Sequence, residues 1–132
     1  MDTGAWLAAF HRRDQYHAAA AGTLRRLRAE RTRLVVTNLI VAELHRHLLY
    51  ALGPARAAMH VHTLVSDALI DQVFADERLQ AAAFTDWIHG FPDQAFTLTD
   101  AVSFAAMRAH GMEAAFTYDR HYAIAGFATL GL

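Results

Sequence analysis

Cysteine and lysine are both absent from this sequence, and only two of its 132 residues are proline. Without cysteine the chain has no disulfide, no thiolate nucleophile and no cysteine-ligated zinc site. No apolar run approaches the roughly 20 residues that a membrane-spanning helix needs. The start also lacks the charged and apolar segments of a secretory signal. These absences lead us to expect no membrane association and a cytoplasmic location.

Excess charge of one sign is also missing, because the formal net charge is -1. A protein that holds nucleic acid by bulk electrostatics would be strongly basic. All twelve basic residues are arginine. One explanation of this bias is the base composition of the genome. A functional explanation is that arginine suits two-pronged contacts with phosphate. The sequence leaves both explanations open.

The hydrophobic content of 55% is enough to fill a sizeable core, and the length fits a single domain over residues 1–132. Apolar periodicity alternates between helical and strand-like stretches. The expected strands are 34–37, 68–70, 95–96 and 113–117, and the expected helices are 14–31, 39–52, 54–66, 74–89, 119–125 and one capped by Thr99 or Asp100 that ends at Gly111.

Connections of this length between strands predict a parallel sheet that is covered by helices on both faces. The expected fold is therefore a three-layer α/β/α domain with a central, mainly parallel sheet of four to five short strands.

Four acidic residues stand far apart in the sequence, each among mostly apolar neighbours: Asp2, Glu43, Asp100 and Asp119. Each is expected near the carboxyl end of a strand or in the first turns of the helix that follows, where sites of open α/β sheets lie. Buried carboxylates are costly without a partner. A divalent cation such as Mg2+, which prefers carboxylate oxygen, is the simplest partner. Nearby hydroxyls at Thr3, Ser103 and Thr117 are candidates to hold a carboxylate or a water.

Structural roles compete with this interpretation. Asp100 fits the N-cap of a helix, which contributes about 1 kcal/mol. Asp119 fits a turn or a cap equally well. Neither a cap nor a solvent-facing position explains Glu43, so the set of four acids favours a metal site more strongly than any single member does.

The order of four motifs closely resembles the PIN domain, and within it the VapC toxins of bacterial toxin–antitoxin pairs. The motifs are Asp-Thr-Gly-Ala-Trp at 2–6, Ala-Glu-Leu at 42–44, Leu-Thr-Asp-Ala-Val-Ser-Phe-Ala at 98–105 and Thr-Tyr-Asp-Arg-His-Tyr at 117–122. The resemblance covers nearly the whole chain, and its last two motifs are the most specific.

The resemblance implies an endoribonuclease that depends on Mg2+ or Mn2+ and hydrolyses RNA phosphodiester bonds. The acidic residues of that family match Asp2, Glu43, Asp100 and Asp119 as metal-binding and catalytic residues. It also implies a cognate VapB-like antitoxin that blocks the site, and a homodimer.

The chain departs from the family at its start, since only Met1 precedes Asp2 and no first strand can form there. We expect the true start to lie upstream, with Met1 standing where an internal valine, encoded by GTG, was taken as the initiator. An intact mass of the native protein that begins at Met1 would contradict this expectation.

Nine histidines require a test for a histidine-bound metal. The pairs His45 and His47, and His60 and His62, are two residues apart, whereas helical zinc pairs are three or four apart. We therefore expect no histidine-ligated metal. His121 follows the last acidic motif, and contact with phosphate, capping and packing all remain open for it.

Two other functions fit the same sequence. One is a non-catalytic PIN-like module that binds RNA or protein, although such a module has no need of four mutually repelling carboxylates. The other is a housekeeping nuclease that processes RNA, which only a neighbouring antitoxin gene would distinguish from a toxin.

Overall fold

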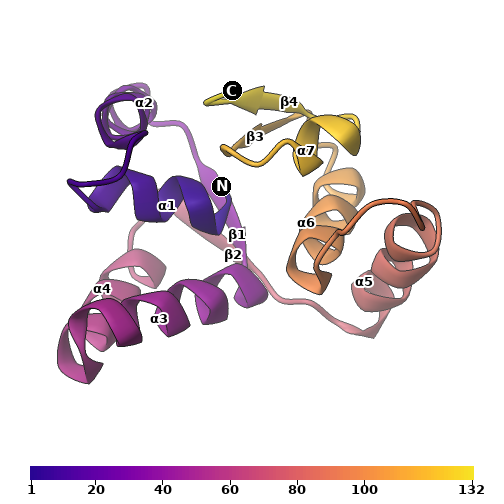
Figure 1. Cartoon of the computed structure of the whole chain (residues 1–132), viewed down its shortest axis with the longest axis horizontal. Helices are drawn as coiled ribbons and strands as arrows, with labels where there is room; N and C mark the ends of the chain where they lie inside the picture. The colour runs from indigo at the N-terminus through magenta and orange to yellow at the C-terminus, as the bar shows by residue number, and fades with distance from the viewer.

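The computed structural model describes all of residues 1–132 as an alternation of helices and short strands (Figure 1). The elements in chain order are α1 (Thr3–Phe10), α2 (His17–Ala29), β1 (Leu34–Thr37), α3 (Asn38–Leu52), α4 (Pro54–Val65), β2 (Ile70–Val73), α5 (Glu77–Ala82), the π-helix η1 (Ala83–Ile88), α6 (Leu98–Ala109), β3 (Ala114–Phe116), α7 (His121–Ile124) and β4 (Ala128–Leu130). None of the helices has both the length and the apolar character needed to cross a bilayer.

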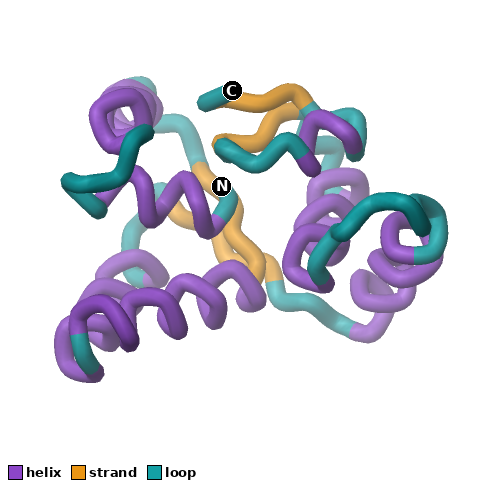
Figure 2. Tube along the Cα trace, viewed as in Figure 1, coloured by secondary structure: helices purple, strands orange, loops and turns teal.

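The strands form two parallel pairs, β1 with β2 and β3 with β4, which confirms the expected parallel α/β fold (Figure 2). The single continuous sheet that we expected is instead divided. Met1 and Asp2 lie between the pairs: the Met1 amino group donates to the Val35 carbonyl at 2.7 Å, and the Asp2 amide donates to the Phe116 carbonyl at 3.0 Å. These two residues link the pairs but do not form a strand between them.

An apolar cavity of about 260 Å3 lies beside this link, lined by residues of β1, β3 and α6 together with Met1. The expected strand at 95–96 is wrong. Residues 95 and 96 are in a loop, and the half-buried Phe96 is held by its ring, which packs edge-on against Phe104 at 5.1 Å, and not by strand pairing. The fourth strand, β4, is one that the sequence analysis did not predict.

Two hydrophobic clusters fill the interior. The first joins α1, α2, β1, α3, α4 and β2, and takes in Phe116 from β3. The second joins η1, α6, β3 and α7, with Phe104 fully buried at its centre. The chain therefore has two packed halves, and Met1 and Asp2 lie where they meet.

Side chains at the starts of α3 and α6 fix where these helices begin. The hydroxyl of Thr37 caps α3 by accepting from the Ile40 amide at 3.2 Å. Thr97, rather than Thr99 or Asp100, caps α6, and Asp100 completes a capping box as its third helical residue. Both cap residues are extended, so each helix begins directly after an extended segment.

Candidate active site

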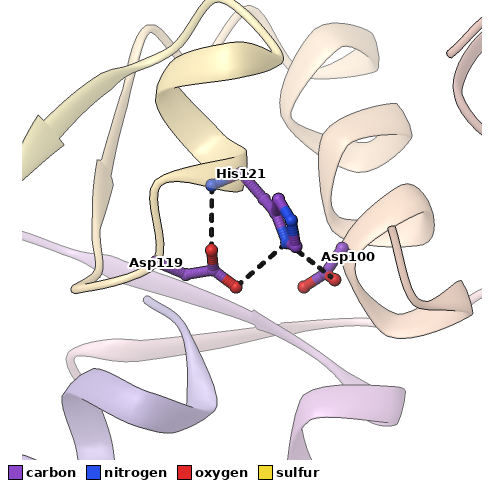
Figure 3. Close-up of side chains that lie close together, drawn as sticks. All are labelled: Asp100, Asp119 and His121. Carbon is purple, nitrogen blue, oxygen red and sulfur yellow. Dashed lines mark hydrogen bonds and ion pairs between the residues drawn. The ribbon is translucent and has the colours of Figure 1, made fainter. Parts of the chain in front are cut away.

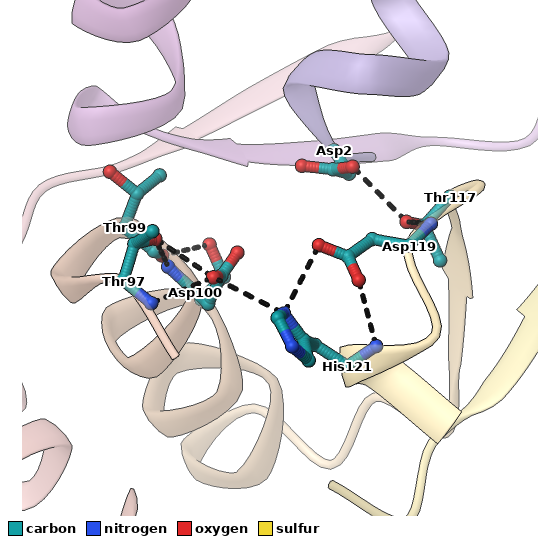
Figure 4. A network of polar contacts seen from close by, with 8 residues as sticks. Asp2, Thr97, Thr99, Asp100, Thr117, Asp119 and His121 are labelled. Carbon is teal, nitrogen blue, oxygen red and sulfur yellow. Dashed lines mark hydrogen bonds and ion pairs between the residues drawn. The ribbon is translucent and has the colours of Figure 1, made fainter. Parts of the chain in front are cut away.

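A polar cavity of about 670 Å3 opens where the two halves meet, and all four acidic residues singled out in the sequence line it. Asp2 precedes α1, Glu43 lies in the second turn of α3, Asp100 lies in the first turn of α6, and Asp119 follows β3. Two acids thus come from each half of the molecule. Figure 4 shows Asp2, Asp100 and Asp119 around a common space.

The tightest group of potential metal ligands is Asp100 and Asp119, which line the cavity, with His121 beside them (Figure 3). The Nδ1 atom of His121 lies 3.3 Å from an oxygen of Asp119 and 3.9 Å from an oxygen of Asp100. One potential ligand atom from each residue falls within 4.8 Å of the others. Oxygen and imidazole atoms this close can share one cation without a large rearrangement.

Asp2 is 9% exposed, and burial raises the pKa of its carboxyl to about 6. The nearby Asp100 also raises this pKa, while a hydrogen bond from the Thr117 hydroxyl at 3.1 Å opposes the shift. Asp2 occupies the N-cap position of α1, yet its side chain accepts no capping hydrogen bond there. The carboxylate is therefore turned to the cavity and to Thr117 instead of to its own helix.

Glu43 is held by Thr3, whose hydroxyl donates to a carboxylate oxygen at 2.7 Å. Of the three hydroxyls expected to hold carboxylates, Thr3 and Thr117 contact Glu43 and Asp2. Ser103 donates to the backbone carbonyl of Thr99 at 2.8 Å. Its hydroxyl therefore supports the first turns of α6.

Asp100 and Asp119 combine structural contacts with a position in the cavity. One oxygen of Asp100 accepts from the amide and the hydroxyl of Thr97, at 2.9 and 2.8 Å. Asp119 accepts from the His121 amide at 2.8 Å, and its own amide donates to Thr117. These bonds fix both side chains without using all their oxygen lone pairs. For Asp100 and Asp119, a structural role in a helix cap or turn is therefore compatible with a place in the candidate metal site.

Burial also raises the pKa of Asp100, and the neighbouring Asp119 adds to the shift. Like charges and removal from water both disfavour ionised carboxylates. Burial and the nearby carboxyls therefore disfavour the ionised form of both Asp2 and Asp100. A bound cation would reverse both effects.

The donor set fits a divalent cation of the Mg2+ or Mn2+ type. Such ions are hard, prefer carboxylate oxygen and keep part of their water shell. Asp100 and Asp119 are placed to hold an ion, and Asp2 and Glu43 are placed to hold its waters or a second ion. His121 adds an imidazole to this set. The sequence did not predict it, because its partners, Asp100 on α6 and Asp119 before α7, are not at helical spacing from it.

The cavity also contains residues that the sequence analysis did not single out as site residues. Asp14 and Tyr16, from the segment between α1 and α2, and Tyr118, which follows β3, line its wall. No periodicity or motif marked Asp14 or Tyr16, and Tyr118 belongs to the motif at 117–122 without having been given a role there. Arg120 lines the same cavity, and it forms no ion pair with Asp100 or Asp119. Its guanidinium is free for a ligand.

Paired parallel strands flanked by helices, with carboxylates from four elements meeting in one cavity, define the PIN class of domain. The family model described as PIN domain matches residues 1–128, and the chain belongs to this family. The resemblance stated from the motifs is thereby confirmed.

Among individual proteins, the chain is similar to VapC20 of Mycobacterium tuberculosis, described as a 23S rRNA-specific endonuclease. The two are 31% identical over 132 aligned residues, which cover 96% of this chain and 93% of VapC20, in strain CDC 1551 / Oshkosh and in strain H37Rv. The crystal structure of M. tuberculosis VapC20, titled a sarcin–ricin loop cleaving toxin, superposes with a TM-score of 0.82. That match has 25% identity and covers 96% of this chain and 94% of that one.

Proposed function

We propose that this protein is a divalent-metal-dependent endoribonuclease and the toxin of a VapBC-type toxin–antitoxin pair. The similarity to VapC20 over nearly the whole chain supports this proposal. It also makes the sarcin–ricin loop of 23S rRNA the first substrate to test. The products would be a 5′-phosphate and a 3′-hydroxyl.

The observation that carries the proposal is the convergence of Asp2, Glu43, Asp100 and Asp119 on one cavity from four separate elements. When bound there, one or two Mg2+ or Mn2+ ions would supply charge neutralisation, a water of lowered pKa and polarisation of the phosphate. A binding module would gain nothing from burying mutually repelling carboxylates.

The residues of the chain have separable roles in this proposal. Asp100 and Asp119 hold the cation, and the hydroxyls of Thr117 and Thr3 orient Asp2 and Glu43 toward it. Ligands that are fixed in this way bind metal more tightly than mobile ones. Arg120 is the one basic residue that lines the cavity, so it is placed to contact a phosphate of the substrate.

We also propose that a VapB-like antitoxin covers the site, that the toxin forms a homodimer and that it acts in the cytoplasm. Exposed apolar side chains support a protein partner: Tyr50 on α3 is 81% exposed and Met59 on α4 is 57% exposed. An arginine from the antitoxin would find the same carboxylates that the cation uses. Residues 1–132 would act as one domain, because the site draws on both halves.

The test is cleavage of an RNA hairpin that contains the sarcin–ricin loop, with Mg2+ or Mn2+. We expect cleavage that EDTA stops and that Asp100→Asn reduces by at least about 100-fold, since even supporting residues around a metal alter its affinity 10–100-fold. Asp86→Asn is the matched control, because Asp86 pairs with Arg108 on the surface. Cleavage that continues unchanged in EDTA would rule the mechanism out.

A further inference from the structure

The wall of the acidic cavity carries two tyrosines in parallel contact. The rings of Tyr16 and Tyr118 are stacked, with centroids 4.3 Å apart and an angle of 12° between their planes. Both residues line the cavity that contains the four acids, and Tyr118 directly precedes Asp119. An aromatic surface therefore adjoins the carboxylates.

The inner ring of this pair is fixed from several sides. Tyr118 packs edge-on against Phe116 at 6.2 Å and belongs to the rim of the first hydrophobic cluster. A Cβ atom at Gly131 would lie 2.6 Å from the Thr117 carbonyl oxygen and 3.1 Å from the Tyr118 ring, so a larger residue there would press on this segment. The Tyr118 ring is thus held in place before any ligand arrives.

The outer ring is positioned by its backbone and left open on one side. The Tyr16 amide donates to the Asp14 carboxylate at 2.8 Å, and the Tyr16 carbonyl accepts from the Ala20 amide at 2.8 Å. Tyr118 covers one face of Tyr16, yet Tyr16 remains 41% exposed. A flat ligand can extend the stack on the open face.

The charge of the cavity decides which part of an RNA this stack can accept. Five carboxylates and a single guanidinium line the cavity: Asp2, Asp14, Glu43, Asp100, Asp119 and Arg120. Anionic phosphates are repelled there except beside Arg120 or a bound cation. A nucleobase is neutral, and its π-face binds aromatic side chains regardless of sequence.

Resting on the proposed function, we infer that Tyr16 and Tyr118 form a stacking subsite for an unpaired nucleobase next to the phosphate that is cut. A base within a duplex is already stacked on both faces and cannot enter, so the subsite selects nucleotides in loops and single strands. Stacking of one base on an aromatic side chain is typically worth about 5- to 150-fold in affinity.

The probe is the sarcin–ricin hairpin with 2-aminopurine placed at each loop position in turn. Binding is measured with Asp100→Asn protein, which prevents cleavage. We expect the fluorescence of one position to be quenched on binding and this quenching to be lost in Asp100→Asn with Tyr16→Ala. Quenching that is the same with and without Tyr16 would overturn the inference.

Cleavage with otherwise unaltered protein gives the second readout. Tyr16→Ala and Tyr16→Leu are expected to raise KM by about 5- to 150-fold with a smaller change in kcat, whereas Tyr16→Phe retains activity, because stacking requires the ring and not the hydroxyl. Phe74→Ala, which removes an exposed aromatic ring outside the cavity, is the control and should have no effect.

The two readouts separate the inference from the function on which it rests. If the unaltered protein cuts RNA and Tyr16→Leu cuts equally well, the stacking subsite is wrong and the nuclease stands. If the unaltered protein cuts no RNA, the nuclease is wrong, and the fluorescence measurement still decides whether a base stacks on Tyr16.

Discussion

The hydroxyl of Thr117 donates to a carboxylate oxygen of Asp2 at 3.1 Å, across 115 positions of sequence. Thr117 is fully buried, and the same hydroxyl accepts from the amide of Asp119. One side chain therefore joins the start of the chain to the loop after β3 and orients two of the proposed metal ligands. This contact and the hydrogen bond from the Asp2 amide to the Phe116 carbonyl together hold the two halves of the site in position.

Replacing Thr117 by valine keeps the shape of the side chain and removes its hydroxyl. We expect Mn2+ affinity, measured by calorimetry, to fall about 10–100-fold, as is typical when a residue that orients a metal ligand is lost. RNA cleavage should fall in parallel at low Mn2+ and recover in part at high Mn2+. Thr63→Val is the control, because the exposed Thr63 hydroxyl bonds only the Met59 carbonyl of its own helix. Equal losses in both variants would assign Thr117 no role in metal binding.

Replacing Asp2 by asparagine should stabilise the metal-free protein near pH 7. Because the pKa of Asp2 rises from 3.8 to about 6 on folding, the folded state binds the proton more tightly than the unfolded state does. The stability that protonation contributes is complete below pH 3.8 and is lost as the pH rises through 6. The shift corresponds to about 3 kcal/mol above that range.

Chemical denaturation in EDTA checks this expectation. The free energy of unfolding of Asp2→Asn should exceed that of the unaltered protein at pH 7, and the difference should vanish toward pH 4. An Asp2→Asn variant that is less stable at pH 7 would show that the ionised carboxylate is satisfied without a cation. Glu43→Gln serves as comparison, since Glu43 lies in the same cavity and is less buried.

Metal binding should stabilise the folded protein against heat. A cation present at about 100 times its dissociation constant adds about 2.7 kcal/mol, because it binds the folded state alone. We expect Mn2+ to raise Tm for the unaltered protein and for Asp86→Asn, and to leave Tm unchanged in Asp100→Asn and Asp119→Asn. A full rise in Tm for the last two variants would place the ion elsewhere.

The second hydrophobic cluster depends on Phe104, which is fully buried and meets the rings of Trp87 at 5.2 Å and Tyr122 at 4.9 Å. Phe104→Ala should lower the free energy of unfolding by about 3–5 kcal/mol, since it removes a buried ring and leaves a cavity. Phe74→Ala is the control, because Phe74 is 66% exposed. A loss below about 1 kcal/mol for Phe104→Ala would contradict the packing described.

The strand 34–37 and the helices 39–52 and 54–66 were predicted within a residue or so of their observed ends. Their apolar periodicity and the Gly53-Pro54 boundary are local signals. The strand expected at 113–117 is observed as β3, within one residue at each end. Prediction was less accurate over 74–89, where the expected helix is divided into α5 and η1, over 68–70, where the strand observed is β2 at Ile70–Val73, and for β4, which was not predicted. Segments this short carry too little periodicity to be distinguished from loops.

The acidic residues of the candidate site were found from the sequence because each stands in an apolar context that makes a carboxylate costly. His121 was not assigned to a metal group, since its distance to Asp100 depends on how α7 packs against α6. Tyr16 escaped notice for the same reason. Nothing near it in the sequence shows that Tyr118 lies beneath its ring.

By itself the sequence determined the class of fold and marked the four acids as candidates, because patterning, turns and burial cost act over a few neighbouring residues. The family followed from the resemblance of its motifs. Tertiary structure alone decided that Met1 and Asp2 lie between two separate strand pairs. It also decided that Thr117 holds Asp2, and that a tyrosine stack borders the carboxylates. These relationships join segments up to 115 positions apart, and only the packing of the two halves against each other sets them.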